Sequence, residues 1–227
     1  MRLRSIVIIM MLLVLVGGAM AQGSYYPQQI GTGKTVKSYG GTNYAMVPAL
    51  QIIPAAESSD DDQIKAAAVN EFNSTTHFVL TSSGTSSSGF LAQPDVPRNI
   101  IVTMNNTATV ALKITGTDIS DAPITENLTW AGETGIKAST KAFKTVTRID
   151  GTASATTVQA KIGTGNLMGL NEKLGTYDNV VSTFVNGVIE GTAAAVTKNS
   201  TVVSLNTVDT ASAPGGYVTL VYYMLKG

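Results

Sequence analysis

The sequence contains no cysteine and a single histidine, His77, and only 13% of its 227 residues are charged. Without cysteine the chain can form no disulfide, thiolate zinc site, iron–sulfur site or haem-attachment motif. A Ser-His-Asp triad would have to be built on His77, and no Gly-x-Ser-x-Gly turn accompanies it. We therefore expect a protein that is not an enzyme and that carries no organic or redox cofactor.

The shortage of charge raises the question of what keeps the surface hydrated, because charged residues make up roughly 25% of an ordinary soluble domain. The chain has 30 Thr and 18 Ser, which supply hydroxyl groups instead. Threonine also favours strands, since its branched side chain fits a pleated surface. The formal net charge is +0. With no basic excess, the sequence gives no reason to expect a nucleic-acid partner.

Residues 1–21 have the three parts of a secretory signal peptide. Arg2 and Arg4 supply a positive start, an apolar run follows from Ser5 to Val16, and Ala19-Met20-Ala21 forms a small-x-small cleavage site. The run is shorter than the about 20 apolar residues that span a bilayer. We predict a secreted protein, extracellular or on the cell surface, that meets the membrane only during export. An uncleaved anchor or a pilin-type stalk is the alternative.

Residues 22–59 are rich in Gly, Tyr and Gln and have no sustained hydrophobic period. We predict an extended N-terminal arm that packs on a neighbouring subunit through Tyr25, Tyr26, Tyr39 and Tyr44, since a fully solvated leader has little use for four large rings. A flexible leader is the alternative.

The arm is followed by a segment with two interpretations. Ser59 or Asp60 is a suitable N-cap with acidic residues after it, which predicts one short helix ending near Phe72. The residues from Ile64 to Leu80 can also be read with the period of two that is typical of a strand. The Ser- and Gly-rich residues 81–90 are predicted to form a loop.

From there the chain alternates apolar and polar residues in short runs separated by turn signals, which predicts strands. Pro94 and Pro97 favour extended backbone and mark the entrance to this β region. Glu126 interrupts the apolar face of one strand, and Asn186-Gly187 predicts a two-residue hairpin. We predict an all-β domain over residues 60–227, a β-sandwich of immunoglobulin-like or jelly-roll-like type. A division into two smaller sandwiches near residues 169–175 stays open.

Two groups of acidic residues are candidate calcium ligands. They are Asp60, Asp61 and Asp62, which are adjacent, and the pair Asp118 and Asp121. Carboxylate oxygens suit calcium, which commonly stiffens exported β proteins. Neither spacing matches an EF-hand loop, and adjacent carboxylates are more often a solvated cap.

Four Asn-x-Ser/Thr sequences could carry glycan in an exported protein. They begin at Asn73, Asn105, Asn127 and Asn199. Asn105 and Asn199 are predicted to lie in turns, and Asn127 is predicted to lie on the face opposite Trp130.

Several segments together resemble a family of β-rich structural proteins of tailed phages and prophages. The similar segments are "QPDVPRNIIVT", "ITGTD", "KAFKTVT", the pattern "GTG…GL…KL" and the closing strands "VSTFVNGVIE" and "GGYVTLVYYM". The resemblance covers residues from about 60 to the end, and it implies a self-assembling shell, decoration or tail component. The signal peptide departs from that family, whose members assemble in the cytoplasm, and this departure suggests an exported relative.

We therefore expect a non-enzymatic secreted structural subunit that assembles with copies of itself into an extracellular layer, sheath or filament. Strand edges and the N-terminal arm would make the contacts. On this view, deletion of residues 22–56 would abolish assembly and leave the fold intact. The alternatives are a monomeric β module that binds a carbohydrate or a receptor, and a virion decoration or tail protein.

Overall fold

The computed structural model describes residues 36–39, 42–66, 78–81, 90–155, 158–176 and 178–226. The predicted signal peptide, Tyr25, Tyr26, Asn73 and His77 lie outside these residues, so their predictions stay predictions. Among the described residues, no helix is long and apolar enough to cross a membrane.

The described chain is built almost entirely from strands, with one short 3-10 helix, which confirms the predicted all-β class. The elements are β1 (Val36–Tyr39), β2 (Thr42–Ala56), β3 (Asp60–Lys65), β4 (Phe78–Thr81), β5 (Arg98–Thr117), β6 (Pro123–Phe143), β7 (Thr145–Ala153), β8 (Ala160–Gly169), β9 (Asn179–Val185), β10 (Val188–Ile189), β11 (Ala195–Thr197), η1 (Val203–Leu205), β12 (Thr207–Asp209) and β13 (Gly216–Lys226).

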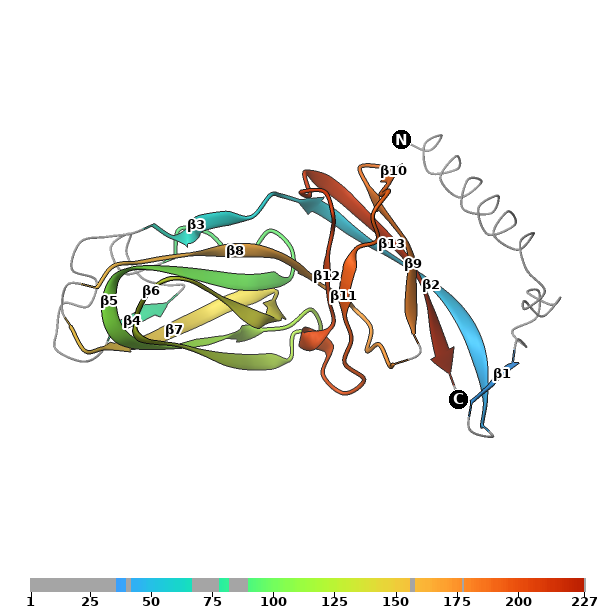
Figure 1. The fold of residues 1–227 in the computed structure, drawn as a ribbon, viewed down its shortest axis with the longest axis horizontal. Helices are drawn as coiled ribbons and strands as arrows, with labels where there is room; N and C mark the ends of the chain where they lie inside the picture. The colour runs from blue at the N-terminus through green and yellow to red at the C-terminus, as the bar shows by residue number, and fades with distance from the viewer. Residues whose placement is uncertain are drawn as a thin grey trace. The chain divides into compact units, whose positions relative to one another are not determined.

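These strands form two antiparallel sheets that pack together as a sandwich. One sheet has the order β1-β2-β13-β9-β10. The other has the order β11-β12-β8-β5-β7-β4, with β3 also paired to β8 and β6 also paired to β5. Figure 1 shows the strands in chain order, from blue β1 to red β13.

By internal contacts the chain divides into two compact units, residues 1–49 with 223–227, and residues 50–222. In the first unit β1 pairs with the beginning of β2, and Tyr39 lies opposite Thr42. Tyr44, opposite Lys37, belongs to the same hairpin. The predicted arm is therefore extended where it is described. All further features belong to residues 50–222.

The predicted arm, residues 22–59, extends into the larger unit, because that unit begins at Leu50 within β2. Ile53 and Ala56 are buried there. The side chain of Gln51 donates to the carbonyl of Gly169 (3.2 Å) and accepts the N–H of Asn171 (3.1 Å). Deleting residues up to 56 would remove these contacts, so the structure argues against an intact fold after that deletion. A test of the arm has to end before Leu50.

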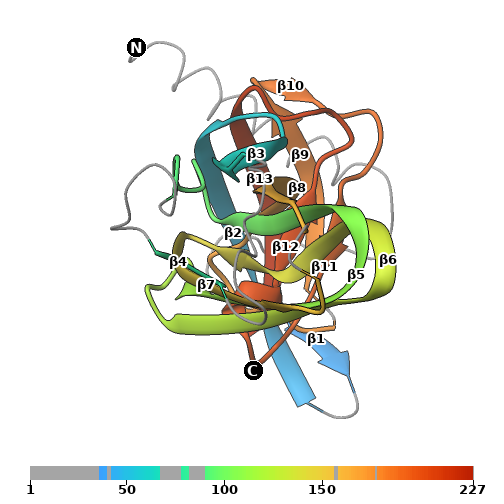
Figure 2. The same cartoon turned by 90° about the vertical axis from the view of Figure 1, so that its left-hand side faces the viewer.

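The larger sheet is organised by one long hairpin, β5 with β6. The first part of β5 also pairs with β8, and its last part also pairs with β7. Between these parts the β5–β6 register shifts after Met104, opposite Gly135. Gly132 and Gly135 have positive φ there, which glycine adopts most readily. The hairpin therefore bends in the middle and curls, as Figures 1 and 2 show from two sides.

The curled sheet encloses the largest group of buried apolar side chains, including Trp130. The fully buried members of this group with the largest side chains are Ile64, Ile100, Met104, Leu112, Ile114, Trp130, Phe143, Ile149 and Ile162. Every one of them comes from β3, β5, β6, β7 or β8. Their burial is the main stabilising contribution to this part of the molecule.

Glu126, the polar exception on an apolar strand, has a structural role. The bend brings the first part of β6 beside its last part, where the Glu126 carboxylate accepts the N–H groups of Thr140 (2.7 Å) and Lys141 (2.9 Å). Lys141 Nζ in turn donates to the carbonyl of Thr125 (2.6 Å). These bonds satisfy backbone groups on the outer side of β6, so this edge of the curled sheet is closed by side chains.

The predicted helix starting at Asp60 is wrong for the residues that the structure describes. Asp60–Lys65 form strand β3, which shares only Ile64 and Lys65 with the segment read alternatively as a strand, and β3 pairs with β8. The pairing is close because Gly163 faces the backbone of β3, where a Cβ would lie 1.8 Å from the carbonyl oxygen of Asp60. A partner strand shaped to receive β3 thus overrides the local helix signal.

The prolines mark the start of one strand and not the entrance to the β region, because β1 to β4 precede them. β5 begins at Arg98, directly after Pro97, whose carbonyl accepts the N–H of Gly169 (2.7 Å). The predicted two-residue hairpin is confirmed. Asn186 and Gly187 have φ of 53° and 80° and join β9 to β10, with Val185 opposite Val188. Both positive φ values are those of the turn that a two-residue hairpin favours.

Candidate interaction surface

The predicted acidic cluster lies on β3, and its three carboxylates are within 4.8 Å of one another. Asp60 accepts the N–H of Asp62 (3.1 Å), and Lys161 pairs with Asp61 (3.2 Å). Hydrogen bonding to Asp60, then partial desolvation and the neighbouring negative charges, raise the pKa of Asp62. The lysine already neutralises part of the negative charge, so the cluster by itself does not establish calcium binding, which stays a prediction.

Asp118 and Asp121, the other candidate ligands, have different partners. Asp118 is buried, and its Oδ1 accepts the N–H groups of Ser120 (2.8 Å) and Ala122 (3.0 Å). This side chain shapes the turn between β5 and β6. Asp121 points both carboxylate oxygens at Lys144 Nζ (2.7 and 2.8 Å). These partners account for both aspartates without a metal ion.

Three of the four predicted glycan sites are described. Asn105 lies in β5 rather than in a turn, and its amide donates to Gln159 (2.5 Å). Asn127 is exposed on β6, on the face opposite the buried Trp130, as predicted. Asn199 lies in the loop after β11, where its Oδ1 accepts the N–H and hydroxyl groups of Thr201 (2.9 and 2.8 Å). Whether any of them carries glycan stays a prediction.

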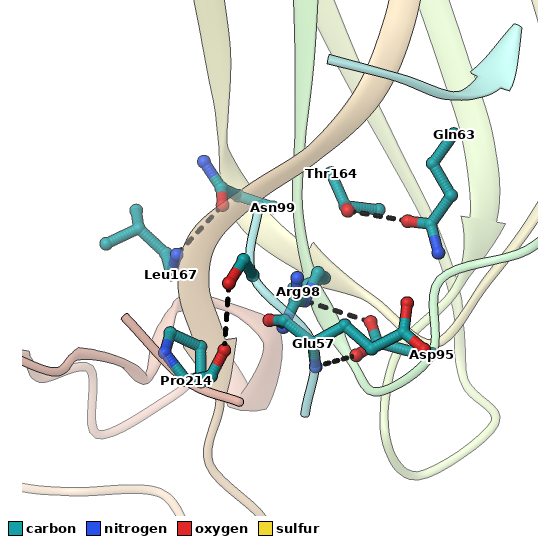
Figure 3. Close-up of polar contacts among 9 residues, drawn as sticks. Glu57, Gln63, Asp95, Arg98, Asn99, Thr164, Leu167 and Pro214 are labelled. Carbon is teal, nitrogen blue, oxygen red and sulfur yellow. Dashed lines mark hydrogen bonds and ion pairs between the residues drawn. The ribbon is translucent and has the colours of Figure 1, made fainter. Parts of the chain in front are cut away.

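A buried arginine that the sequence did not single out holds the entrance of β5. The Arg98 side chain is fully buried, forms an ion pair with Asp95 (3.1 Å) and donates through Nη2 to the carbonyl of Glu57 (2.8 Å). Asp95 also accepts the N–H of Glu57 (2.6 Å). Figure 3 shows these contacts together. Burial lowers the pKa of Arg98, and the negative charge of Asp95 opposes that shift.

Further polar contacts in Figure 3 join the same region to neighbouring segments. Asn99 accepts the N–H of Leu167 (3.0 Å), and the Thr164 hydroxyl donates to Gln63 (2.6 Å). Ser58, after β2, donates to the carbonyl of Pro214 (3.2 Å). The Arg98 region therefore fastens the connection between β2 and β3 to the start of β5. Most of its polar groups bond to one another, which is the arrangement of a structural lock, although Arg98 Nη1 has no hydrogen-bond partner among the described residues.

A shallow groove of about 350 Å³ lies on the outer surface of β5, β6 and β7. Ala111 and Gly151 are small residues that lower its floor, and Lys113, Asn127 and Asp150 border it. None of the residues that line it is aromatic. The single tryptophan, Trp130, is buried in the core and offers no ring there. This groove thus lacks the stacking ring by which proteins often hold sugars.

The sheet that contains β2, β13, β9 and β10 differs in charge from the sheet that contains β5 to β8. Within the larger unit, its four strands comprise residues 50–56, 179–185, 188–189 and 216–222, and none of these residues is charged. In contrast, each of β5, β6, β7 and β8 carries at least one lysine or arginine. The edge strands of monomeric proteins are normally protected, most often by charged side chains. The uncharged sheet lacks that protection.

One face of this uncharged sheet is apolar and exposed. Ile53, Val185, Val218 and Leu220 point inward and are buried. Leu50 and Ile52 on β2, Tyr217 on β13 and Ile189 on β10 are 47%, 57%, 55% and 49% exposed. Phe184 and Val221, on the strands between them, are half-buried. We call these six outward residues the apolar face. Exposed apolar side chains gathered on one side of a sheet are typical of an interaction site.

Sequence reasoning missed the apolar face, although one signal was present. In the run "LQIIPAA", apolar residues occupy both faces of the strand, so its outward residues are as apolar as its inward ones. A strand with one hydrated face alternates instead. The missing information was which strands are neighbours, since β2, β13 and β9 are far apart in sequence.

The inner side of the same sheet includes a tyrosine whose ionisation opposes folding. Tyr222 is 1% exposed, and its hydroxyl donates to Asn171 (3.1 Å). Burial, and secondarily the negative charge of Glu172, raise the pKa of Tyr222 to about 12. The pKa of an unfolded tyrosine is about 10. Folding therefore favours the neutral phenol, and this contribution is complete below pH 10 and is lost as the pH rises towards 12.

Between about pH 10 and 12, we expect the thermal midpoint of Tyr222→Phe to fall less than that of the wild type, because the variant has no phenol at this position to ionise. Differential scanning calorimetry across this range measures the decline. Tyr217→Phe, at an exposed position, is the control and should decline as the wild type does. An identical decline in the wild type and in Tyr222→Phe would show that Tyr222 does not carry the effect.

The comparisons with known proteins do not assign the chain to a family. No family model matches it, and neither a curated protein nor a solved structure gives a significant match.

Proposed function

We propose that the protein is a non-enzymatic, secreted structural subunit that assembles with copies of itself into an extracellular layer, sheath or filament. The observation that carries the proposal is the exposed apolar face, whose strands carry no charged residue within residues 50–222. Burying charged side chains in a contact would cost desolvation free energy, whereas burying apolar side chains stabilises the contact.

A second copy of the chain is the partner that these properties favour. Two copies of an uncharged surface do not repel one another, and the same patch can pair with itself across a two-fold axis. Without residues 1–21, which contain Arg2 and Arg4, the chain has 13 Lys and Arg against 15 Asp and Glu, a net charge of −2 that gives little long-range repulsion between subunits. The signal-like leader and the resemblance to phage structural proteins agree with an exported, self-assembling component.

The test compares two isoleucine-to-aspartate variants of the secreted chain. Ile52 lies in the apolar face, and Ile136, 66% exposed on β6, lies in the other sheet. We expect Ile52→Asp to weaken self-association at least about tenfold, roughly 1.4 kcal/mol, because the contact would bury an unpaired carboxylate. Sedimentation velocity over a range of concentrations measures the association.

Ile136→Asp introduces the same charge at an equally accessible isoleucine and should associate as the wild type does. If both variants associate like the wild type, the apolar face is not the contact. If the wild type itself stays monomeric at every concentration, the proposed function is wrong.

A further inference from the structure

The edge of the uncharged sheet is only partly covered by its last strand. β10 pairs with two residues of β9, Phe184 and Val185. One more bond follows, from the N–H of Glu190 to the carbonyl of Thr183 (2.9 Å). On that side of β9, the sheet order contains no other strand within the described residues.

The direction of the backbone groups follows from this pairing. In an antiparallel ladder, alternate residues direct their N–H and C=O groups to the same side. Thr183 and Val185 face β10, so Val181 and Asn179 face the same side, beyond the end of β10. The Val181 side chain is 50% exposed. The open edge thus offers two N–H and two C=O groups, placed symmetrically about Val180.

This edge lacks the usual protections. Residues 179–189 contain no charged residue and no proline, and four of the first seven are valine or phenylalanine. β2, at the other side of the sheet, carries the exposed Pro54, a residue that has no N–H for a further strand. Of these two strands, β9 is therefore the one suited to receive an additional strand.

We propose that β9 pairs antiparallel with the β9 edge of a second copy, with Val180 opposite Val180 at the two-fold axis. Val181 of each copy then exchanges both backbone hydrogen bonds with Asn179 of the other. The proposed pairing uses no backbone group of Thr183, whose carbonyl already accepts the N–H of Glu190. The absence of charge on both edges removes the like-charge repulsion that a two-fold contact would otherwise create.

This inference deepens the proposed function, on which it rests, by adding a second contact. An isologous contact through the apolar face and an isologous contact through the β9 edge use different surfaces of one subunit. Each alone gives a dimer, and the two together give an open-ended chain of subunits. Such a chain has the connectivity of a filament, with continuous sheets joined across the β9 edges.

The cysteine-free sequence permits a direct test by cross-linking. In the proposed pairing, Val180 and its copy are a pair without mutual hydrogen bonds, whose Cα atoms lie about 4.5 Å apart. That separation suits a disulfide. We expect Val180→Cys, oxidised mildly at a concentration where the wild type associates, to give covalent dimer on non-reducing gels. The matched control is Val202→Cys, at an exposed valine before η1, and its dimer fraction should be at least about tenfold lower.

Equal thermal midpoints of the wild type and Val180→Cys establish that the variant is folded. If the wild type associates and the two cysteine variants cross-link equally, the β9 pairing is wrong and the proposed function stands. If sedimentation shows that the wild type is monomeric, both are wrong. Preferential cross-linking at position 180 supports both.

Discussion

The Asp95→Asn variant is expected to lose about 3–5 kcal/mol of unfolding free energy, because it removes the carboxylate paired with the buried guanidinium of Arg98 and leaves only the weaker attraction of Glu57. The Arg98 side chain is 0% exposed, and that of Asp95 is 12% exposed. The same carboxylate accepts the N–H of Glu57, so the substitution also disturbs the connection between β2 and β3. Urea unfolding followed by far-UV circular dichroism measures the loss.

Asp121→Asn is the matched control, since it makes the same chemical change in an ion pair at the surface. The side chains of Lys144 and Asp121 are 41% and 69% exposed. A pair of this kind contributes about 0–1 kcal/mol. Similar losses for Asp95→Asn and Asp121→Asn would contradict the interpretation of the Arg98 region as a buried lock.

The Gly163→Ala variant is expected to lose at least about 2 kcal/mol, because no methyl group fits between β8 and β3. Its Cβ would lie 1.8 Å from one backbone oxygen and 2.5 Å from a backbone carbon of the facing strand. Backbone atoms cannot rotate away as a side chain can, so β3 would have to separate from β8. Chemical unfolding of the two proteins in parallel gives the difference.

Gly191→Ala provides the comparison, because a Cβ at Gly191 meets nothing within 4 Å. Its stability should stay within about 0.5 kcal/mol of the wild type. A Gly163→Ala protein as stable as Gly191→Ala would mean that β3 does not pack closely against β8.

Local sequence patterns predicted the fold class and several boundaries. Alternation placed most strands, Pro97 marked the start of β5, and Asn186-Gly187 marked the hairpin after β9. These features depend on neighbouring residues alone, because proline fixes φ and Asn-Gly accepts the positive φ of the turn.

The features that the sequence did not reveal depend on residues far apart in the chain. Asp60 carries a good helix-start signal, but β3 pairs with Gly163, about a hundred residues away. The sequence gives Arg98 no mark that separates it from an ordinary strand residue, and only the fold places the carbonyl of Glu57 beside the Arg98–Asp95 ion pair. The apolar face likewise combines strands from opposite ends of the chain, so only their pairing reveals it.

Asp118 is a candidate calcium ligand by sequence, and the structure gives it a local role in its turn, while calcium binding there stays a prediction. Its carboxylate bonds to two N–H groups of its own turn. Aspartate is common in turns for this reason, and the sequence pattern alone does not separate a turn-shaping carboxylate from a ligand.

Negative-stain electron microscopy of the purified protein without residues 1–21 tests the proposed self-assembly. We expect regular layers or filaments whose repeat is a single subunit or a two-fold pair, and we expect Ile52→Asp to lack them. A field of dispersed single subunits at high protein concentration, for a protein that circular dichroism shows to be folded, would contradict it.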